Sequence, residues 1–254
     1  MDNSDSASDS IGDTNSIDIR SDAASALTAG PFLSRLQLDH DVIKSYYTAY
    51  VGLYNGSSSR QALSLEIALY ICRLAGFERW GTKRALEGYE IHAQDSEVES
   101  FVWFHFGPFT KQALNHIKSV QLVTMSRHQG WVSNRNAGSW SWFELRVARP
   151  KDEDVTRAEV KRRVDGDEMS WCSHRHPVDP ETAQQQKDYA EHKGVVFDSD
   201  HKLWEEVREG DVLQVVMKAQ FGGWSNTVSD GMLRINIWWE PSVEMLDLMR
   251  RGNV

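Results

Sequence analysis

The chain has 254 residues, of which 40% are hydrophobic and 26% charged, and its formal net charge is −9. This length and apolar content suffice for a globular protein with a sizeable core. The acidic balance excludes a nucleic-acid partner as the first expectation, because phosphate binding requires a basic face. No stretch is apolar enough to predict a membrane span, and the N-terminus has no signal-peptide pattern. We therefore expect a cytoplasmic or nucleocytoplasmic protein.

The N-terminal third differs from the rest of the chain. Residues 1–30 carry six aspartates and one arginine, and we expect them to form a disordered acidic tail. Residues 31–97 are predicted to form a helical layer, with one helix over 38–55 and a second ending at Leu74. In the second helix one apolar stripe recurs at helical spacing, which predicts the buried face: Leu63, Ile67, Tyr70, Ile71 and Leu74.

Residues 98–241 alternate between apolar and polar side chains and predict an antiparallel β-sandwich. Within residues 211–241, two alternating runs flank a Gly-Gly-Trp-Ser-Asn turn, a pattern typical of a β-hairpin. A looser copy occupies residues 118–150. Further strands are predicted over residues 100–106 and 169–176, and residues 242–254 are predicted to be a C-terminal helix or tail.

The two hairpin copies share a Gly-Trp pair, Gly130-Trp131 and Gly223-Trp224. The glycines allow the strand to bend, and each tryptophan then either plugs the end of the sandwich or forms an aromatic platform in the loops. A platform would suit a carbohydrate, because aromatic faces stack on sugars while amides bond hydroxyls. The candidate ligand-binding residues are Trp131, Asn134, Trp140, Trp224 and Asn226.

The run WCSHRH supports a different hypothesis. On a strand, Cys172, His174 and His176 would share one face, and all three are zinc-ligand types. His192, His201 or Asp198 could supply a fourth ligand. The alternative is a polar strand face with a half-buried cysteine.

The segment EGDVLQVVMKAQFGGWSNTV, together with RHQGW and GSWSWFELRV upstream, resembles a β-sandwich module of uncharacterised fungal proteins. Their shared pattern is a Gly-Asp before one strand, a Gly-Trp-x-Asn turn and a Gln-Gly-Trp…Ser-Trp-x-Trp-Phe pair. The resemblance covers residues 118–239 and implies a galactose-binding-like or related sandwich, without an activity to transfer. His128 stands where the module usually has an acidic residue.

We therefore expect a mainly β (α+β) fold, an antiparallel β-sandwich with a helical N-terminal layer. No complete catalytic motif is present, so the expected function is a non-catalytic binding module for a carbohydrate or a protein, without a cofactor. The rival hypothesis is a metal-dependent enzyme with zinc at Cys172, His174 and His176. A third hypothesis is a purely structural protein with buried tryptophans.

Overall fold

The computed structural model describes residues 40–132, 138–152, 154–178 and 188–238, together with residues 242, 244, 247, 248 and 251. The predicted tail, residues 1–30, lies outside the described residues, and so does most of the predicted C-terminal helix. The elements in chain order are α1 His40–Asn55, α2 Leu65–Leu74, β1 Glu78–Arg84, β2 Tyr89–His92, β3 Val98–Phe106, α3 Lys111–His116, β4 Ile117–His128, β5 Ser141–Lys151, β6 Asp154–Val160, β7 Ser170–Arg175, β8 Ala190–Asp198, α4 Lys202–Glu206, β9 Val212–Gln220 and β10 Ser225–Trp238.

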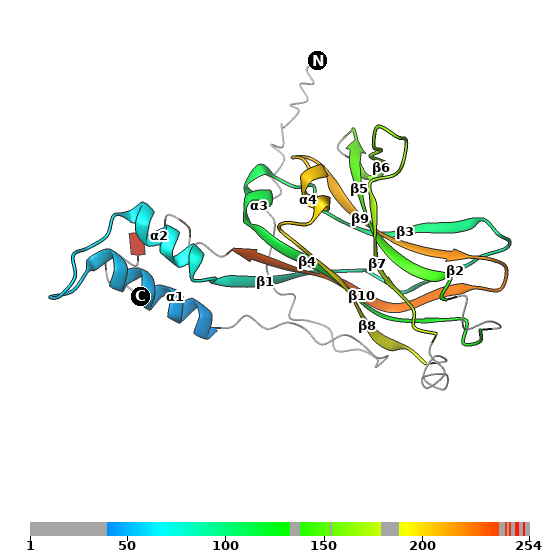
Figure 1. Cartoon of the computed structure of the whole chain (residues 1–254), viewed down its shortest axis with the longest axis horizontal. Helices are drawn as coiled ribbons and strands as arrows, with labels where there is room; N and C mark the ends of the chain where they lie inside the picture. The colour runs from blue at the N-terminus through cyan, green and yellow to red at the C-terminus, as the bar shows by residue number, and fades with distance from the viewer. Residues whose placement is uncertain are drawn as a thin grey trace, which may run out of the picture.

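The strands form two packed antiparallel sheets (Figure 1). The first sheet has the order β1-β10-β4-β8, and β2 continues the β1 edge along β10. The second has the order β3-β9-β5-β6, with β7 also pairing with β5. When β1 with β2, and β6 with β7, are each counted as one broken edge strand, this is the strand order of a jelly roll. The predicted class, an antiparallel β-sandwich, is confirmed.

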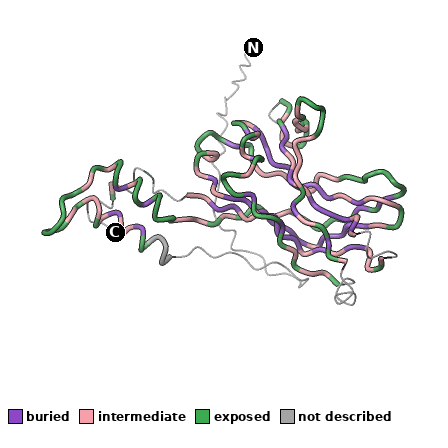
Figure 2. The backbone as a smooth tube through the Cα atoms, viewed as in Figure 1, coloured by how far each residue is buried: buried purple, intermediate pink, exposed green. Residues whose placement is uncertain are grey.

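The core lies between the sheets, where Figure 2 shows the buried stretches of the strands. Leu122 and Leu233 are fully buried from the first sheet, and Leu145 and Val215 from the second. Within each strand the core residues alternate with residues outside the core, as Leu213, Val215, Met217 and Ala219 do in β9. Every second side chain therefore points into the interior between the sheets. The apolar alternation of the sequence thus predicts the inward face of these four strands.

The predicted hairpins are wrong, because neither pair of consecutive strands is hydrogen-bonded together. β4 lies in the first sheet and β5 in the second, while β9 lies in the second sheet and β10 in the first. Each copy is an arch that crosses from one sheet to the other. The copies pair with each other instead: Leu122 of β4 lies opposite Leu233 of β10, and Leu145 of β5 lies opposite Val215 of β9.

The helical region is smaller than predicted, because the sandwich begins at β1 and not at residue 98. Helices α1 and α2 pair around a cluster of their own, Tyr46, Tyr50, Ala68 and Cys72, which shares no residue with the sandwich core. The helical hairpin lies beyond the outer end of β1 and does not form a layer over a sheet (Figure 1). No helix in the described ranges is long and apolar enough to cross a membrane.

The predicted buried stripe of α2 is also wrong. Ala68 and Cys72, on the other side of the helix, are buried against α1. The predicted stripe is exposed at four positions: Ile67, Tyr70, Ile71 and Leu74. The physical reason is that α2 is apolar around most of its circumference. Periodicity therefore offers two candidate faces, and packing against α1 selects the one with the small side chains.

Candidate functional site

The ends of four central strands meet at the end of the sandwich away from the helical hairpin (Figure 1). His128, the last residue of β4, lies opposite Asn226 near the start of β10. Ser141, the first residue of β5, lies opposite Ala219 near the end of β9. The two Gly-Trp turns therefore come together in space, as the repeat suggested, and we call this end the Gly-Trp rim.

Trp131 lies exposed on the Gly-Trp rim, with 58% of its surface accessible. Its ring lies over Gly223: a Cβ built on that glycine would be 3.3 Å from the ring atoms Cη2 and Cζ2. Gly223 has a φ of 92°, which few other residues adopt. The tryptophan ring of the first turn therefore packs on the backbone of the second turn, at a position where glycine has no side chain.

A glutamine ties the two turns together. The Nε2 of Gln129 donates a hydrogen bond of 2.8 Å to the carbonyl of Trp131, and its Oε1 accepts one of 3.3 Å from the backbone N–H of Ser225. The side chain therefore spans from the first arch to the second. This bridge fixes the backbone of Trp131, and the contact with Gly223 positions its ring.

The other two tryptophans are half-buried packing residues. Trp224 lies against the ring of His128, with 5.8 Å between ring centroids. Trp140 meets Phe221 edge to face at 4.6 Å. The two interpretations of the tryptophans therefore apply to different residues. Trp224 and Trp140 pack at the end of the sandwich, whereas Trp131 is exposed to solvent.

Asn226, predicted to bind ligand, is fully buried and lies away from any binding surface. Its Nδ2 donates hydrogen bonds to the carbonyls of Trp142, at 2.9 Å, and Lys218, at 3.2 Å. Asn226 belongs to the first sheet and both acceptors to the second, so the side chain links the sheets. The prediction fails because alternation on β10 turns this amide inward. Asn134 lies outside the described residues.

The predicted metal ligands do not converge, because β7 contains a β-bulge. The register along β5 shifts between His174, which pairs with Phe143, and Cys172, which pairs with Glu144. Phe143 faces the core and Glu144 the outside, so the bulge sends Cys172 to the outer surface and turns His174 inward. The expectation that the three side chains share one face is wrong.

His174 of β7 and His176, which follows the strand directly, belong to a network of histidines and hydroxyls. His176 contacts the hydroxyl of Ser141 through Nδ1, at 2.7 Å, and that of Ser126 through Nε2, at 3.0 Å. The Nε2 of His174 lies 3.0 Å from the hydroxyl of Thr124, whose oxygen is 2.8 Å from that of Ser126. The network therefore runs continuously from β5 through β4 to β7.

Burial sets the protonation of these rings. Desolvation, followed by the neighbouring His192, lowers the pKa of His174 to about 3. Desolvation also lowers the pKa of His176 and of His192, whose rings lie 5.2 Å apart. Both nitrogens of His174 and of His176 are engaged by hydroxyls. Among the described residues, no group of three or more His, Cys, Asp or Glu is arranged to hold a metal ion.

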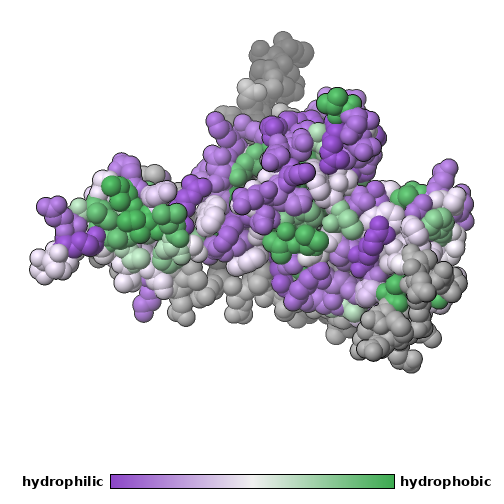
Figure 3. All heavy atoms as spheres, in the orientation of Figure 1, coloured by the Kyte–Doolittle hydropathy of each residue, from purple (hydrophilic) through white to green (hydrophobic). Residues whose placement is uncertain are grey.

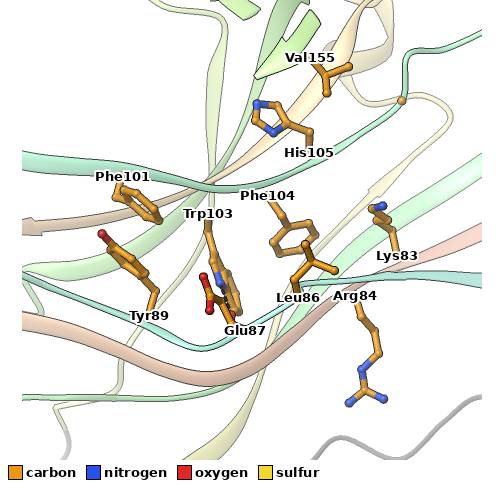
Figure 4. A pocket seen from close by; sticks show the side chains of 11 residues that line it. Lys83, Arg84, Leu86, Glu87, Tyr89, Phe101, Trp103, Phe104, His105 and Val155 are labelled. Carbon is orange, nitrogen blue, oxygen red and sulfur yellow. Dashed lines mark hydrogen bonds between the residues drawn. The ribbon is translucent and has the colours of Figure 1, made fainter. Parts of the chain in front are cut away.

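A hollow that could not be predicted from the sequence opens between the edges of the two sheets (Figure 4). Its volume is about 360 Å³, and it lies between β3 and the connection from β1 to β2. Tyr89 stacks on Phe101 with 3.8 Å between centroids, and the Nε1 of Trp103 donates a hydrogen bond of 2.8 Å to the carbonyl of Glu87. Lys83 lies at the opposite end (Figure 4).

A bulge in β3 shapes this hollow. Alternation predicts that Trp103 and His105 point the same way, but the pairing with β9 shifts register between Val102 and Phe104. Trp103 and Phe104 therefore both pack on the core, while His105 lies on the outer face beside Gln214. Burial, and then the charges of Arg146 and Lys83, lower the pKa of His105. The sequence signal that could have indicated this bulge is the run of three adjacent apolar residues at 102–104, which interrupts the alternation.

A scan against protein-family models and a search of curated proteins returned no match to this chain. The functional interpretation therefore follows from the geometry of the described residues.

Proposed function

We propose that the protein is a non-catalytic binding module whose ligand contact is the Gly-Trp rim, with Trp131 as the central residue. The observation that carries the proposal is that this large aromatic side chain is exposed and yet held in place. A fixed aromatic ring loses little conformational freedom when it binds, and tryptophan is enriched among residues that dominate binding energy.

A saccharide is the ligand class that we propose first. The accessible face of Trp131 can stack on the C–H face of a sugar ring, an arrangement typical of shallow polar-aromatic sites. Rim residues of both arches surround it, so a bound ligand would contact both turns. A protein ligand with an exposed apolar or aromatic group is the alternative within the same class of function.

The metal-dependent enzyme is not favoured by the geometry. It required Cys172, His174 and His176 to converge, and the bulge in β7 separates the first from the other two. The two histidines instead serve the hydroxyl network between the sheets.

Saccharide binding can be tested by screening the full chain on a glycan array, followed by NMR titration of the tryptophan indole N–H signals with each hit. We expect the Trp131 signal to shift and the Trp131→Ala variant to raise the Kd about tenfold or more. Trp80→Ala is the matched control, because Trp80 is 44% exposed on β1, at the other end of β10. Equal weakening by both variants, or no hit on the array, would contradict the saccharide proposal.

A further inference from the structure

Helix α2 carries an apolar face that the described part of the chain leaves uncovered. Its members recur at helical spacing, and their exposed fractions are 52%, 62%, 36% and 68% for Ile67, Tyr70, Ile71 and Leu74. We call these four residues the α2 stripe. Figure 3 shows hydrophobic side chains gathered on the helical hairpin.

The spacing of the α2 stripe is that with which a helix packs against another helix. Residues i, i+3, i+4 and i+7 form one continuous face. The opposite side of α2 already packs on α1 through Ala68 and Cys72. Contiguous apolar surface of this kind is typical of an interaction site in a soluble protein. The question is which partner fits it.

The charges beside the α2 stripe indicate the partner. Glu66 lies in the first turn of α2 and Arg73 in the last, and both are exposed. Seven residues apart, they lie within about 20° of each other around the helix. Successive residues of an α-helix are rotated by about 100° around its axis. By this rotation Glu66 and Arg73 lie along one edge of the α2 stripe, on the side away from Ala68 and Cys72. The flank is acidic at one end and basic at the other.

Such a flank complements a second copy of itself in the antiparallel orientation. In such a pair the two-fold axis passes between the two α2 helices, perpendicular to both helix axes and to the line that joins them. This rotation reverses the direction of the second helix and leaves the charged flanks of both helices on the same side of the contact. Glu66 of each copy then lies beside Arg73 of the other, at both ends. A parallel pair would place the two flanks on opposite sides of the contact.

We infer that the protein forms a homodimer through antiparallel packing of the α2 stripe of each copy. Ile67 of one copy faces Leu74 of the other, and Tyr70 and Ile71 pack around the two-fold axis. Two Glu66–Arg73 ion pairs set the orientation. Arg73 donates one hydrogen bond of 3.5 Å to the carbonyl of Asn115, and this exposed guanidinium has further N–H groups that can bind Glu66 of the second copy.

The dimer forms and dissociates with protein concentration. Helix α2 has ten residues and is therefore about 15 Å long. A contact of this length buries less surface than the 1,200–2,000 Å², roughly, that stable interfaces bury. We therefore expect a weak association and take a Kd on the order of micromolar as the value to test.

The test is sedimentation velocity of the full chain between about 1 µM and about 500 µM, a range that brackets a micromolar Kd. We expect a shift from monomer to dimer, and Leu74→Lys should abolish the dimer over this range. Glu66→Arg places like charges together at both ends and should raise the Kd about tenfold. The double variant Glu66→Arg/Arg73→Glu restores opposite charges and should return the Kd to the wild-type value.

Lys44→Glu, an exposed charge reversal on α1, is the matched control and should leave the Kd unchanged. Far-UV circular dichroism of each variant checks that α2 remains folded. A monomer at every concentration overturns the inference. A dimer that Leu74→Lys leaves intact, or that the double charge reversal fails to rescue, overturns it as well. A dimer that appears when residues 1–39 are removed identifies that segment, and not a second copy, as the occupant of the stripe.

Discussion

Asn226 is a buried amide that links the two sheets of the sandwich. The Nδ2 of one side chain in the first sheet satisfies two carbonyls of the second. A buried carbonyl without a donor is costly, so this amide matters for stability more than for ligand contact. The same end of the molecule thus separates its roles: Asn226 joins the sheets inside, and Trp131 faces outward.

Asn226→Ala should lower the free energy of unfolding by about 1–3 kcal/mol, because two buried carbonyls lose their donor. Urea unfolding measures the effect as a lower midpoint with an unchanged m-value. Asn115→Ala, at an exposed site on α3, is the control and should change stability by less than about 0.5 kcal/mol. Equal stability of Asn226→Ala and the wild type would show that water replaces the amide.

At the scale of the element, the bulge in β7 contributes to the response of the molecule to acid. Its bulge turns His174 inward, next to His176, and both rings lie close to His192. The strand itself could be predicted from the sequence, since residues 169–176 alternate. The bulge could not, because it depends on the register with β5, a strand about thirty residues earlier. One extra residue reversed the face assigned to Cys172.

Stability should fall as the pH drops below about 6.5, where histidines of the unfolded chain take up protons. The folded state resists protonation, because the pKa of His174 is lowered to about 3 and those of His176 and His192 are also lowered. Each such histidine contributes a loss of up to about 1.4 kcal/mol per pH unit. The stabilisation is therefore fully present above pH 6.5 and decreases on acidification.

This prediction can be checked by urea unfolding between pH 7.5 and 5.5, above the range in which most carboxylates titrate. His192→Gln should reduce the slope, since it removes one of the three rings whose pKa is lowered. His92→Gln, at an exposed histidine, is the matched control. A slope that is the same for wild type and His192→Gln would contradict the assignment.

At the scale of the whole molecule, the fold consists of a sandwich and a helical hairpin with separate hydrophobic clusters. A chain that begins at Glu78 should therefore fold without residues 1–77. We expect its free energy of unfolding to change by less than about 1 kcal/mol, because units without shared packing contribute independently. Near-UV circular dichroism and urea unfolding test this. Loss of the cooperative transition would show that the hairpin supports the sandwich.

The sequence predicted six of the ten strands in the described ranges, namely β3, β4, β5, β7, β9 and β10, because local alternation encodes them. It also predicted the inward faces of β4, β5, β9 and β10 and the meeting of the two Gly-Trp turns, but not the strands β1, β2, β6 and β8. It did not distinguish a hairpin from an arch. Alternation is the same in both, and the difference depends on which distant strand supplies the hydrogen bonds. The open hollow at β3 and the exposed α2 stripe were missed for a similar reason: each depends on packing between segments far apart in the chain.

The pairing of the two arches has a consequence for the order of folding. Leu122 of β4 lies opposite Leu233 of β10, so this edge of β4 stays open until β10 has been synthesised, although β8 can pair with the other edge earlier. Contacts between such distant residues make folding slow, and unpaired strand edges in the meantime favour aggregation. Ribosome-bound chains that end before β10 should therefore depend on chaperones, and production of the full-length protein should improve when translation and folding are slowed together at low temperature.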